Sequence, residues 1–252
     1  MSLRKLQSLV SRPILLKIAY LFFTYIYLVF LIAGSVLAAP PADFDSKGPF
    51  QPEMVDGAGL IEKMVKEADS LKDYSLVFET ITFKGKETIN ERGKLSFKKP
   101  KLMRLEEIGD YKKGSLAVLC KDGMVRAHAG GLIKFVTLTL RPDDKQLDAA
   151  NGDKMEDSDL ASLANLLARR IKEGNLSRAT AKPVPCNLGN GTAYVLELFH
   201  KSNPTVCLKR VYVDPVSHLP LRWDDYDYKT PCTSKWFDIR TNIGLSDDLF
   251  KI

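Results

Sequence analysis

Residues 93–107 read GKLSFKKPKLMRLEE, and apolar and polar side chains alternate on both sides of a basic, proline-containing turn. Leu95 and Phe97 fall on one face of the first segment, and Met103 and Leu105 fall on one face of the second. An alternation with a period of two residues is typical of strands that bury one face. This stretch therefore predicts two adjacent antiparallel strands with an apolar side and a polar side.

The same alternation extends outward along most of the chain. Turn signals punctuate it, among them the Asp-Gly pair at 122–123, which favours a tight hairpin. Strands at this spacing predict an antiparallel meander. The predicted strands lie near 75–84, 88–98, 102–109, 115–121, 124–129, 132–140, 178–184, 192–200, 205–213, 219–228 and 233–241.

Two segments show helical spacing instead. Apolar residues recur with a helical period over 60–71, after Asp56 as a candidate N-cap, and again over 160–171, where Asp157 or Ser158 could cap. The second helix interrupts two runs of strands. We therefore expect an α+β fold: a curved, incompletely closed antiparallel β-barrel of about ten or eleven strands, with helices covering or filling the concave face.

The N-terminus is predicted to be an export signal. Residues 1–38 carry four basic residues and no acidic one, followed by an apolar run and small residues before Ala38. An uncleaved anchor is the alternative, because residues 18–38 are long enough to span a bilayer. Either way the folded part would lie outside the cytoplasm, in the periplasm, soluble or anchored. Residues 39–56 are predicted to be a Pro-rich linker, and residues 57–252 a single domain.

The net charge of +6 comes mostly from this N-terminus. Without residues 1–38, the chain has 33 basic residues against 31 acidic ones. A nearly neutral domain does not have the basic surface that nucleic-acid binding requires. We therefore predict no nucleic-acid partner, and contact with a membrane only through residues 18–38 if they are retained.

Five pieces in order resemble the LolA/LolB-like superfamily of periplasmic lipoprotein carriers, which includes the lipid-sensing domain of the RseB regulator. The resemblance is to an uncharacterised branch of that superfamily and spans about 57–252. The pieces are LIEKMVKEADSLKDYSLVFE (60–79), GKLSFKKPKLMRLEE (93–107), VLCKDGMVRAH (118–128), VYVDPVSHLPLRWDDYDY (211–228) and NIGLSDDLFK (242–251).

The resemblance implies an unclosed antiparallel barrel with helices as a lid, and binding of lipids or lipoprotein acyl chains without catalysis. The alternative is an anchored module with a filled barrel that binds another envelope protein. The resemblance also implies a lid or rim contact at Lys99 and Arg104. Carriers tend to have Arg where Lys99 stands, and Lys lacks the planar fork of a guanidinium.

Alternating strand faces supply candidates for the lining of an apolar cavity. The same residues would also fit an ordinary filled core, so an open cavity follows from the resemblance and not from the alternation. The candidates are Phe97, Met103, Leu105, Val118, Phe135, Leu196, Leu198, Leu208, Trp223 and Trp236.

Four cysteines in an exported chain allow three complete disulfide pairings. Cys207 and Cys232 follow turns at the same end of the predicted meander, so their bridge is preferred. The three histidines show no metal-binding spacing, and no catalytic or nucleotide-binding motif is present. We therefore predict no enzyme, no catalytic residues, no cofactor and no metal site.

Overall fold

A computed structural model describes residues 52–131, 135–226 and 230–252. The signal or anchor predicted for 1–38, and residues 39–51 of the predicted linker, lie outside the described residues. So do parts of the strands predicted over 132–140 and 219–228. The described residues all belong to one compact unit.

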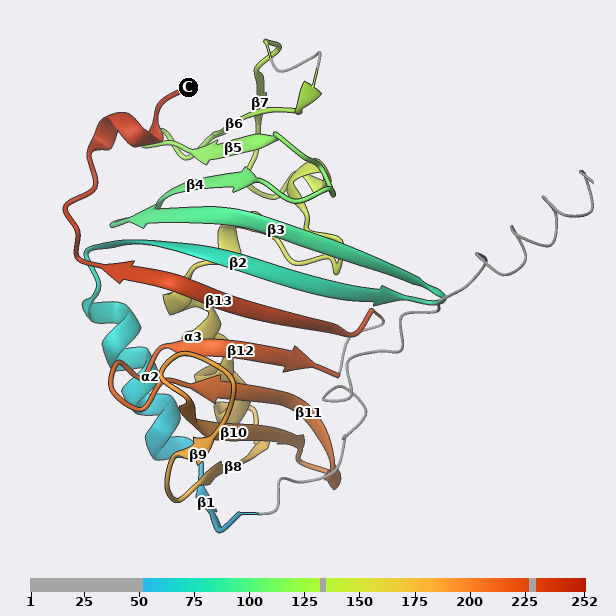
Figure 1. Cartoon of the computed structure of the whole chain (residues 1–252), viewed down its shortest axis with the longest axis vertical. Helices are drawn as coiled ribbons and strands as arrows, with labels where there is room; N and C mark the ends of the chain where they lie inside the picture. Colours follow the sequence, from blue (N-terminus) through green and yellow to red (C-terminus); the bar gives the residue numbers. More distant parts are fainter. Residues whose placement is uncertain (1–51, 132–134, 227–229) are drawn as a thin grey trace, which may run out of the picture. The chain divides into compact units, whose positions relative to one another are not determined.

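The fold is one antiparallel sheet with two helices on one face, which we call the concave face (Figure 1). The strand order is β1-β8-β10-β11-β12-β13-β2-β3-β4-β5-β6-β7, and β9 pairs with β10. The first and last strands of this order do not pair with each other among the described residues, so the sheet is not closed. The predicted α+β fold with an incompletely closed antiparallel sheet is confirmed.

The sheet has thirteen strands, two more than the sequence predicts. The additional strands are the short β1, inside the predicted linker, and β9. The strands are β1 (Met54–Asp56), β2 (Asp73–Lys84), β3 (Glu87–Lys98), β4 (Leu102–Glu107), β5 (Leu116–Leu119), β6 (Val125–His128), β7 (Leu138–Leu140), β8 (Leu176–Thr180), β9 (Val184–Pro185), β10 (Thr192–His200), β11 (Asn203–Val213), β12 (Pro220–Asp225) and β13 (Cys232–Thr241).

The register of β3 and β4 matches the alternation in the sequence. Leu95 lies opposite Leu105, and Phe97 lies opposite Met103. These side chains join the main core on the concave face, together with residues from both helices. The helices are α2 (Ala58–Ser70) and α3 (Leu160–Lys172), and three short 3₁₀ helices are η4 (Lys145–Leu147), η5 (Met155–Asp157) and η6 (Asp247–Phe250).

The strand order explains why a segment crosses the concave face. The chain runs through β2 to β7 at one edge of the sheet and resumes at β8 near the other edge. The connection between them, residues 141–175, contains α3. It therefore has to travel across the sheet, and α3 contacts α2 on the way.

A second, smaller core lies on the opposite, convex face. Phe250 of η6 packs there with Leu102 and Val118. Asp247 adds ion pairs to Lys98 and Lys121, each at 2.6 Å between nitrogen and oxygen. The C-terminal segment therefore covers the outside of β4 and β5.

Candidate functional site

A cavity of about 1020 Å³ lies between the sheet and the connection that crosses it. Strands β2 to β7, β12 and β13 contribute to its floor, and residues 146–169 contribute to its cover. A volume of this size falls at the upper end of the range of small-molecule sites. The cavity is therefore large enough for an elongated ligand.

The floor of the cavity is apolar along one cross-strand row. Residues opposite one another on neighbouring strands point to the same side of a sheet, and this row runs from β3 to β7. The cover adds Leu147, Met155, Leu163 and Leu166. The row consists of Leu95, Leu105, Ala117, Ala127 and Leu138.

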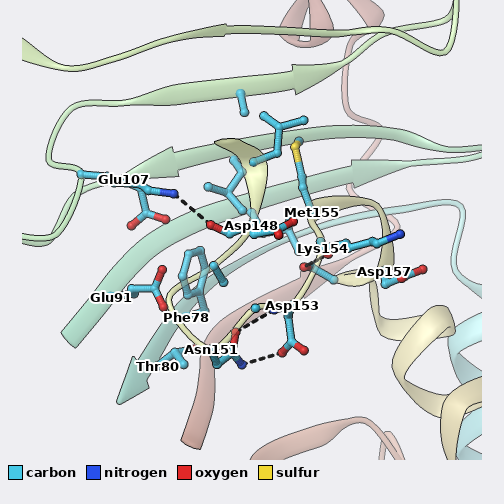
Figure 2. A pocket seen from close by; sticks show the side chains of 18 of the residues that line it. Phe78, Thr80, Glu91, Glu107, Asp148, Asn151, Asp153, Lys154, Met155 and Asp157 are labelled. Atoms are coloured by element: carbon cyan, nitrogen blue, oxygen red, sulfur yellow. Dashed lines mark hydrogen bonds between the residues drawn. The ribbon is translucent and has the colours of Figure 1, made fainter. Parts of the chain in front are cut away.

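A second row, four residues away along β3, makes one end of the cavity polar. It runs across β12, β13, β2 and β3 through Trp223, Ser234, Thr80 and Glu91. The hydroxyl oxygens of Thr80 and Ser234 lie 2.9 Å apart, at hydrogen-bonding distance. We call this region the polar end, and Figure 2 shows Thr80 and Glu91 there beside Phe78.

Glu91 connects the polar end to the cover. Its two carboxylate oxygens accept the backbone N–H of Ala150, at 3.1 and 3.2 Å. Nearby, the ammonium group of Lys112 donates to the carbonyl oxygen of Asp148 at 2.9 Å. Both contacts tie the segment before α3 to the strand side of the cavity.

Glu107 lies diagonally from Glu91 on the same wall, because its partner in β3 is Gly93. Its side chain is buried, with 7% of the residue exposed, and its Oε2 atom accepts no hydrogen bond from any described residue. Burial, and then the charge of Glu91, raise the pKa of Glu107 to about 7. Burial also raises the pKa of Glu91. Two carboxyl groups thus face a largely apolar space. The hydrogen bonds from Ala150 and the charge of Lys112 offset the effect of burial on their pKa values only in part.

Gly93 makes room for this wall. A Cβ atom at this position would lie 2.5 and 2.6 Å from two ring carbons of Phe78. Only a residue without a side chain lets that ring lie across β3 at this point. Phe78 then forms part of the wall next to both carboxylates.

Three contacts fix the start of α3 over the cavity. Asp159 caps the helix by accepting the N–H of Ser162 at 3.0 Å, and Lys101 donates to Asp159 at 2.6 Å. The N–H of Leu160 donates to the hydroxyl of Tyr74 at 2.9 Å. Burial alone would raise the pKa of Asp159, but the hydrogen bonds from Lys101 and Ser162 outweigh it and hold the pKa below its usual value.

The ten predicted lining residues are dispersed over five environments. Leu105, Trp223 and Trp236 line the cavity. Val118 belongs to the convex core, Phe135 is 84% exposed, and Leu208 lies half-buried at a β-bulge outside the cavity lining. The remaining four are buried in the main core, where the sheet is filled by the helices: Phe97, Met103, Leu196 and Leu198.

Neither predicted rim residue contacts the cavity lining. Lys99 donates to the carbonyl oxygen of Asp69, in the last turn of α2. Arg104 lies on the convex side, where it donates to Glu106 at 2.8 Å and to the carbonyl oxygen of Leu249 at 3.3 Å. The contact between the β3–β4 turn and the cover is made by Lys101 instead.

The predicted bridge between Cys207 and Cys232 is not present, because all four cysteines are free thiols. Strand β12 separates β11 from β13, so the two residues are not on adjacent strands. Cys232 lines the cavity on the concave face. Burial, and then the charge of Glu197, raise the pKa of Cys207 to about 12. Glu197 forms an ion pair with Arg210, and the charges of both residues act on Cys207.

The sequence pattern contains a signal for the two buried carboxylates that our sequence analysis missed. Glu107 follows Leu105 by two residues, and Glu91 precedes Leu95 by four. Both acids therefore fall on the face that the alternation assigns to the apolar interior. An acidic residue on the apolar face of a strand is the signal that could have identified them.

Within the described ranges, no group of three or more His, Cys, Asp or Glu side chains is arranged to hold a metal ion. His128 lines the cavity, and its Nδ1 atom lies 3.1 Å from the carbonyl oxygen of Ala129. None of the helices between residues 52 and 252 that the structure describes has the length and apolar character to cross a membrane.

No protein-family model matches the chain, and no curated protein matches it. Solved structures with similar folds include a LolA superfamily protein from Nitrosomonas europaea, with 11% identity over 79% of this chain and 98% of that one, and a TM-score of 0.43. A DUF1329 family protein from Desulfovibrio piger has 14% identity over 77% and 95%, and a TM-score of 0.40. The lipoprotein LppX of Mycobacterium tuberculosis has 10% identity over 76% and 97%, and a TM-score of 0.37.

Proposed function

We propose that this protein is a non-catalytic binding protein that holds a lipid, or the acyl chain of a lipoprotein, in the cavity under α3. The observation that carries the proposal is the cavity itself, about 1020 Å³ with an apolar row along its floor. The resemblance of the sequence to lipoprotein carriers points the same way. A ligand with a long apolar chain fits this combination of length and lining.

The energetics of such a site need no reactive group. Each methylene that leaves water for an apolar surface contributes about 0.8 kcal/mol. A chain placed along Leu95, Leu105, Ala117 and Ala127 would also meet the tryptophans of β12 and β13. Affinity would then come from the buried area, and selectivity from the polar end.

We also propose that the protein is exported, and that residues 1–38 are removed by cleavage after Ala38. Residues 57–252 would then form the single binding domain in the periplasm. The intact mass of the protein from its native envelope tests this proposal. A mass that begins at Ala39 supports cleavage, whereas a mass that includes residues 18–38 favours the anchored alternative.

The direct test of binding is to purify residues 39–252 under native conditions, extract any bound lipid from the purified protein and identify it by mass spectrometry. Stoichiometric acyl lipid or lipopeptide is the expected result. A fluorescent probe with an uncharged head group on an acyl chain then measures affinity after delipidation. An empty protein that also rejects the probe would overturn the proposal and leave binding of another envelope protein as the alternative.

A matched pair of variants locates the probe. Ala127→Phe places a ring inside the cavity, because Ala127 is half-buried and lines the floor. Thr139→Phe adds the same ring on the neighbouring strand but on the other face, where Thr139 is exposed opposite Arg126. We expect at least a tenfold weaker probe affinity for Ala127→Phe and no change for Thr139→Phe. Equal affinities in both variants would place the probe elsewhere.

A further inference from the structure

The polar end of the cavity contains a buried acceptor without a donor among the described residues. Glu107 is more than nine-tenths buried, lines the cavity, and has an Oε2 atom that accepts no hydrogen bond within the described part of the chain. A buried acceptor without a donor is costly, so a ligand that supplies the donor gains that free energy on binding. The structure thus contains a receptor for a hydrogen-bond donor.

The second carboxylate strengthens the case for a positive charge. Glu91 is 4% exposed and is a diagonal cross-strand neighbour of Glu107, which places the two about 7–8 Å apart at the Cα atoms. The hydrogen bonds that Glu91 accepts come from the neutral N–H of Ala150. A cation placed between the two carboxylates would therefore relieve their mutual repulsion.

Lys112 is the basic residue whose charge acts on both Glu91 and Glu107. Its ammonium group donates to the carbonyl oxygens of Asp148 and Gln146, at 2.9 and 3.5 Å. Its positive charge favours the ionised form of both carboxyl groups and so lowers their pKa values. Among the contacts of the described residues, no hydrogen bond joins it to either carboxyl group. Lys112 therefore leaves the Oε2 atom of Glu107 without a donor among the described residues.

The charge of the whole lining agrees with the local arrangement. The described residues around the cavity include seven carboxylates, of which Asp225 pairs with the buried Lys209, and four Lys or Arg side chains, so negative charge remains in excess. A fatty-acid anion would enter against this excess of negative charge, whereas an ammonium group would enter with it. Charge complementarity thus favours a cationic amphiphile.

We propose that the cavity takes an acyl or alkyl chain that ends in a protonated amine, and that Glu107, supported by Glu91, receives the ammonium group. This inference rests on the proposed lipid-binding function and specifies its ligand class. The chain would lie along the apolar row from Leu95 to Leu138. The head group would lie at the wall formed by Phe78, Glu91 and Glu107, and Figure 2 shows these three side chains.

The test compares three ligands with the same chain in displacement of the fluorescent probe: tetradecylamine, tetradecanol and tetradecanoic acid, each below its micelle concentration. We expect the amine to bind at least tenfold more tightly than the acid. In Glu107→Gln the amine should lose about tenfold in affinity while the alcohol and the acid change by less than threefold. The tenfold loss corresponds to about 1.4 kcal/mol.

Glu106→Gln is the matched control. Glu106 adjoins Glu107 on β4 but faces the convex side, where Arg104 donates to it. The control should bind all three ligands as the wild type does. An acid that binds as tightly as the amine, or a Glu107→Gln variant that weakens all three ligands equally, would overturn the inference. Failure of all three ligands to displace the probe would instead count against the proposed lipid-binding function.

Discussion

Glu107 links the cavity to the stability of the protein through its proton. Its pKa is about 7 in the folded protein and close to 4.5 in an unfolded chain. Between these values the folded state binds the proton more tightly, so the free energy of unfolding falls as the pH rises through this window. The groups whose charges act on this carboxyl are Glu91, which opposes ionisation, and Lys112, which favours it.

Glu107→Gln should remove this pH dependence. At pH 8 the variant should be more stable than the wild type by up to about 3 kcal/mol, because one pKa unit corresponds to about 1.4 kcal/mol. At pH 4.5 the two proteins should be equally stable. Urea unfolding at both pH values measures the difference, with Glu106→Gln as the control. A variant that is less stable than the wild type at pH 8 would contradict the burial of an ionised carboxylate here.

Gly93 offers a second test at a single position. In Gly93→Ala the new Cβ atom would also lie 2.7 Å from the carbonyl oxygen of Glu106, so backbone as well as the Phe78 ring blocks it. Overpacking of this kind typically costs about 1–3 kcal/mol. The same change at Gly59, in α2, meets nothing within 4 Å. Gly59→Ala should stabilise the protein by about 0.5–1 kcal/mol, since Ala favours the helix.

Thermal and urea unfolding of both variants decide the point. If Gly93→Ala proves as stable as the wild type, the close packing of Phe78 on β3 is wrong. If Gly59→Ala also destabilises, the loss at Gly93 could not be assigned to that packing.

The faces of individual residues could be predicted from the sequence, but their environments could not. The alternation in 93–107 correctly places Leu95 with Phe97 on one face and Met103 with Leu105 on one face, and the register pairs these residues across β3 and β4. It does not distinguish a side chain under α2 and α3, such as Phe97, from one under the cavity, such as Leu105. That difference depends on where the crossing segment leaves space, which is a property of distant residues.

The position of α3 over the cavity depends on its first turn. Asp159 caps the helix and is nearly fully buried, whereas Lys101, which binds it, is 45% exposed at the side chain. Loss of an N-cap typically costs about 1 kcal/mol and at most about 2. We therefore expect Asp159→Ala to cost 1–2 kcal/mol, and Lys101→Met to cost about 0.5 kcal/mol because its partner remains a cap.

A double-mutant cycle separates the two contributions. In the Asp159→Ala background, Lys101→Met should have no further effect, because the ammonium group has lost its partner. Lys99→Met is the control, since Lys99 belongs to the same β3–β4 turn but donates to the carbonyl oxygen of Asp69 in α2 and not to α3. It should change stability by less than about 0.5 kcal/mol. Additive losses for Asp159 and Lys101 would show that the ion pair does not hold α3.

Most elements follow from local pattern, and the exceptions have physical causes. The helical periodicity places α2 and α3 correctly, but α3 is capped by Asp159 and not by Asp157 or Ser158. Several oxygen-bearing side chains precede the helix, and the contacts of Asp159 with Ser162 and with the distant Lys101 mark it as the cap. Strands β1 and β9 are too short to show an alternation, and each is defined by a partner strand: β8 for β1 and β10 for β9.

At the scale of the molecule, the pairing of β13 with β2 decides where the cavity forms. It joins the two runs of strands into one sheet, so the connection between β7 and β8 must cross the concave face. Nothing local in the sequence specifies this pairing, because the two strands lie about 150 residues apart. The cavity and its cover are therefore consequences of topology, which local patterns do not reveal.

The same topology separates stability from binding. Phe250 packs on Val118, on the convex face, while the neighbouring Ala117 lines the cavity on the other face. Phe250 is 3% exposed, and truncation of a buried Phe typically costs about 3–5 kcal/mol. We expect Phe250→Ala to lose about 3 kcal/mol of unfolding free energy while the affinity for the uncharged fluorescent acyl probe stays within about twofold.

Ile243→Ala is the control for this prediction, because Ile243 belongs to the same C-terminal stretch and is 47% exposed. Its stability should remain within about 0.5 kcal/mol of the wild type. Both measurements are made at a temperature where Phe250→Ala is fully folded. If probe affinity falls together with stability in Phe250→Ala alone, the C-terminal segment shapes the cavity through β4 and β5. The two faces of the sheet are then coupled. If affinity holds, the C-terminal segment stabilises a sheet whose concave face binds independently of it.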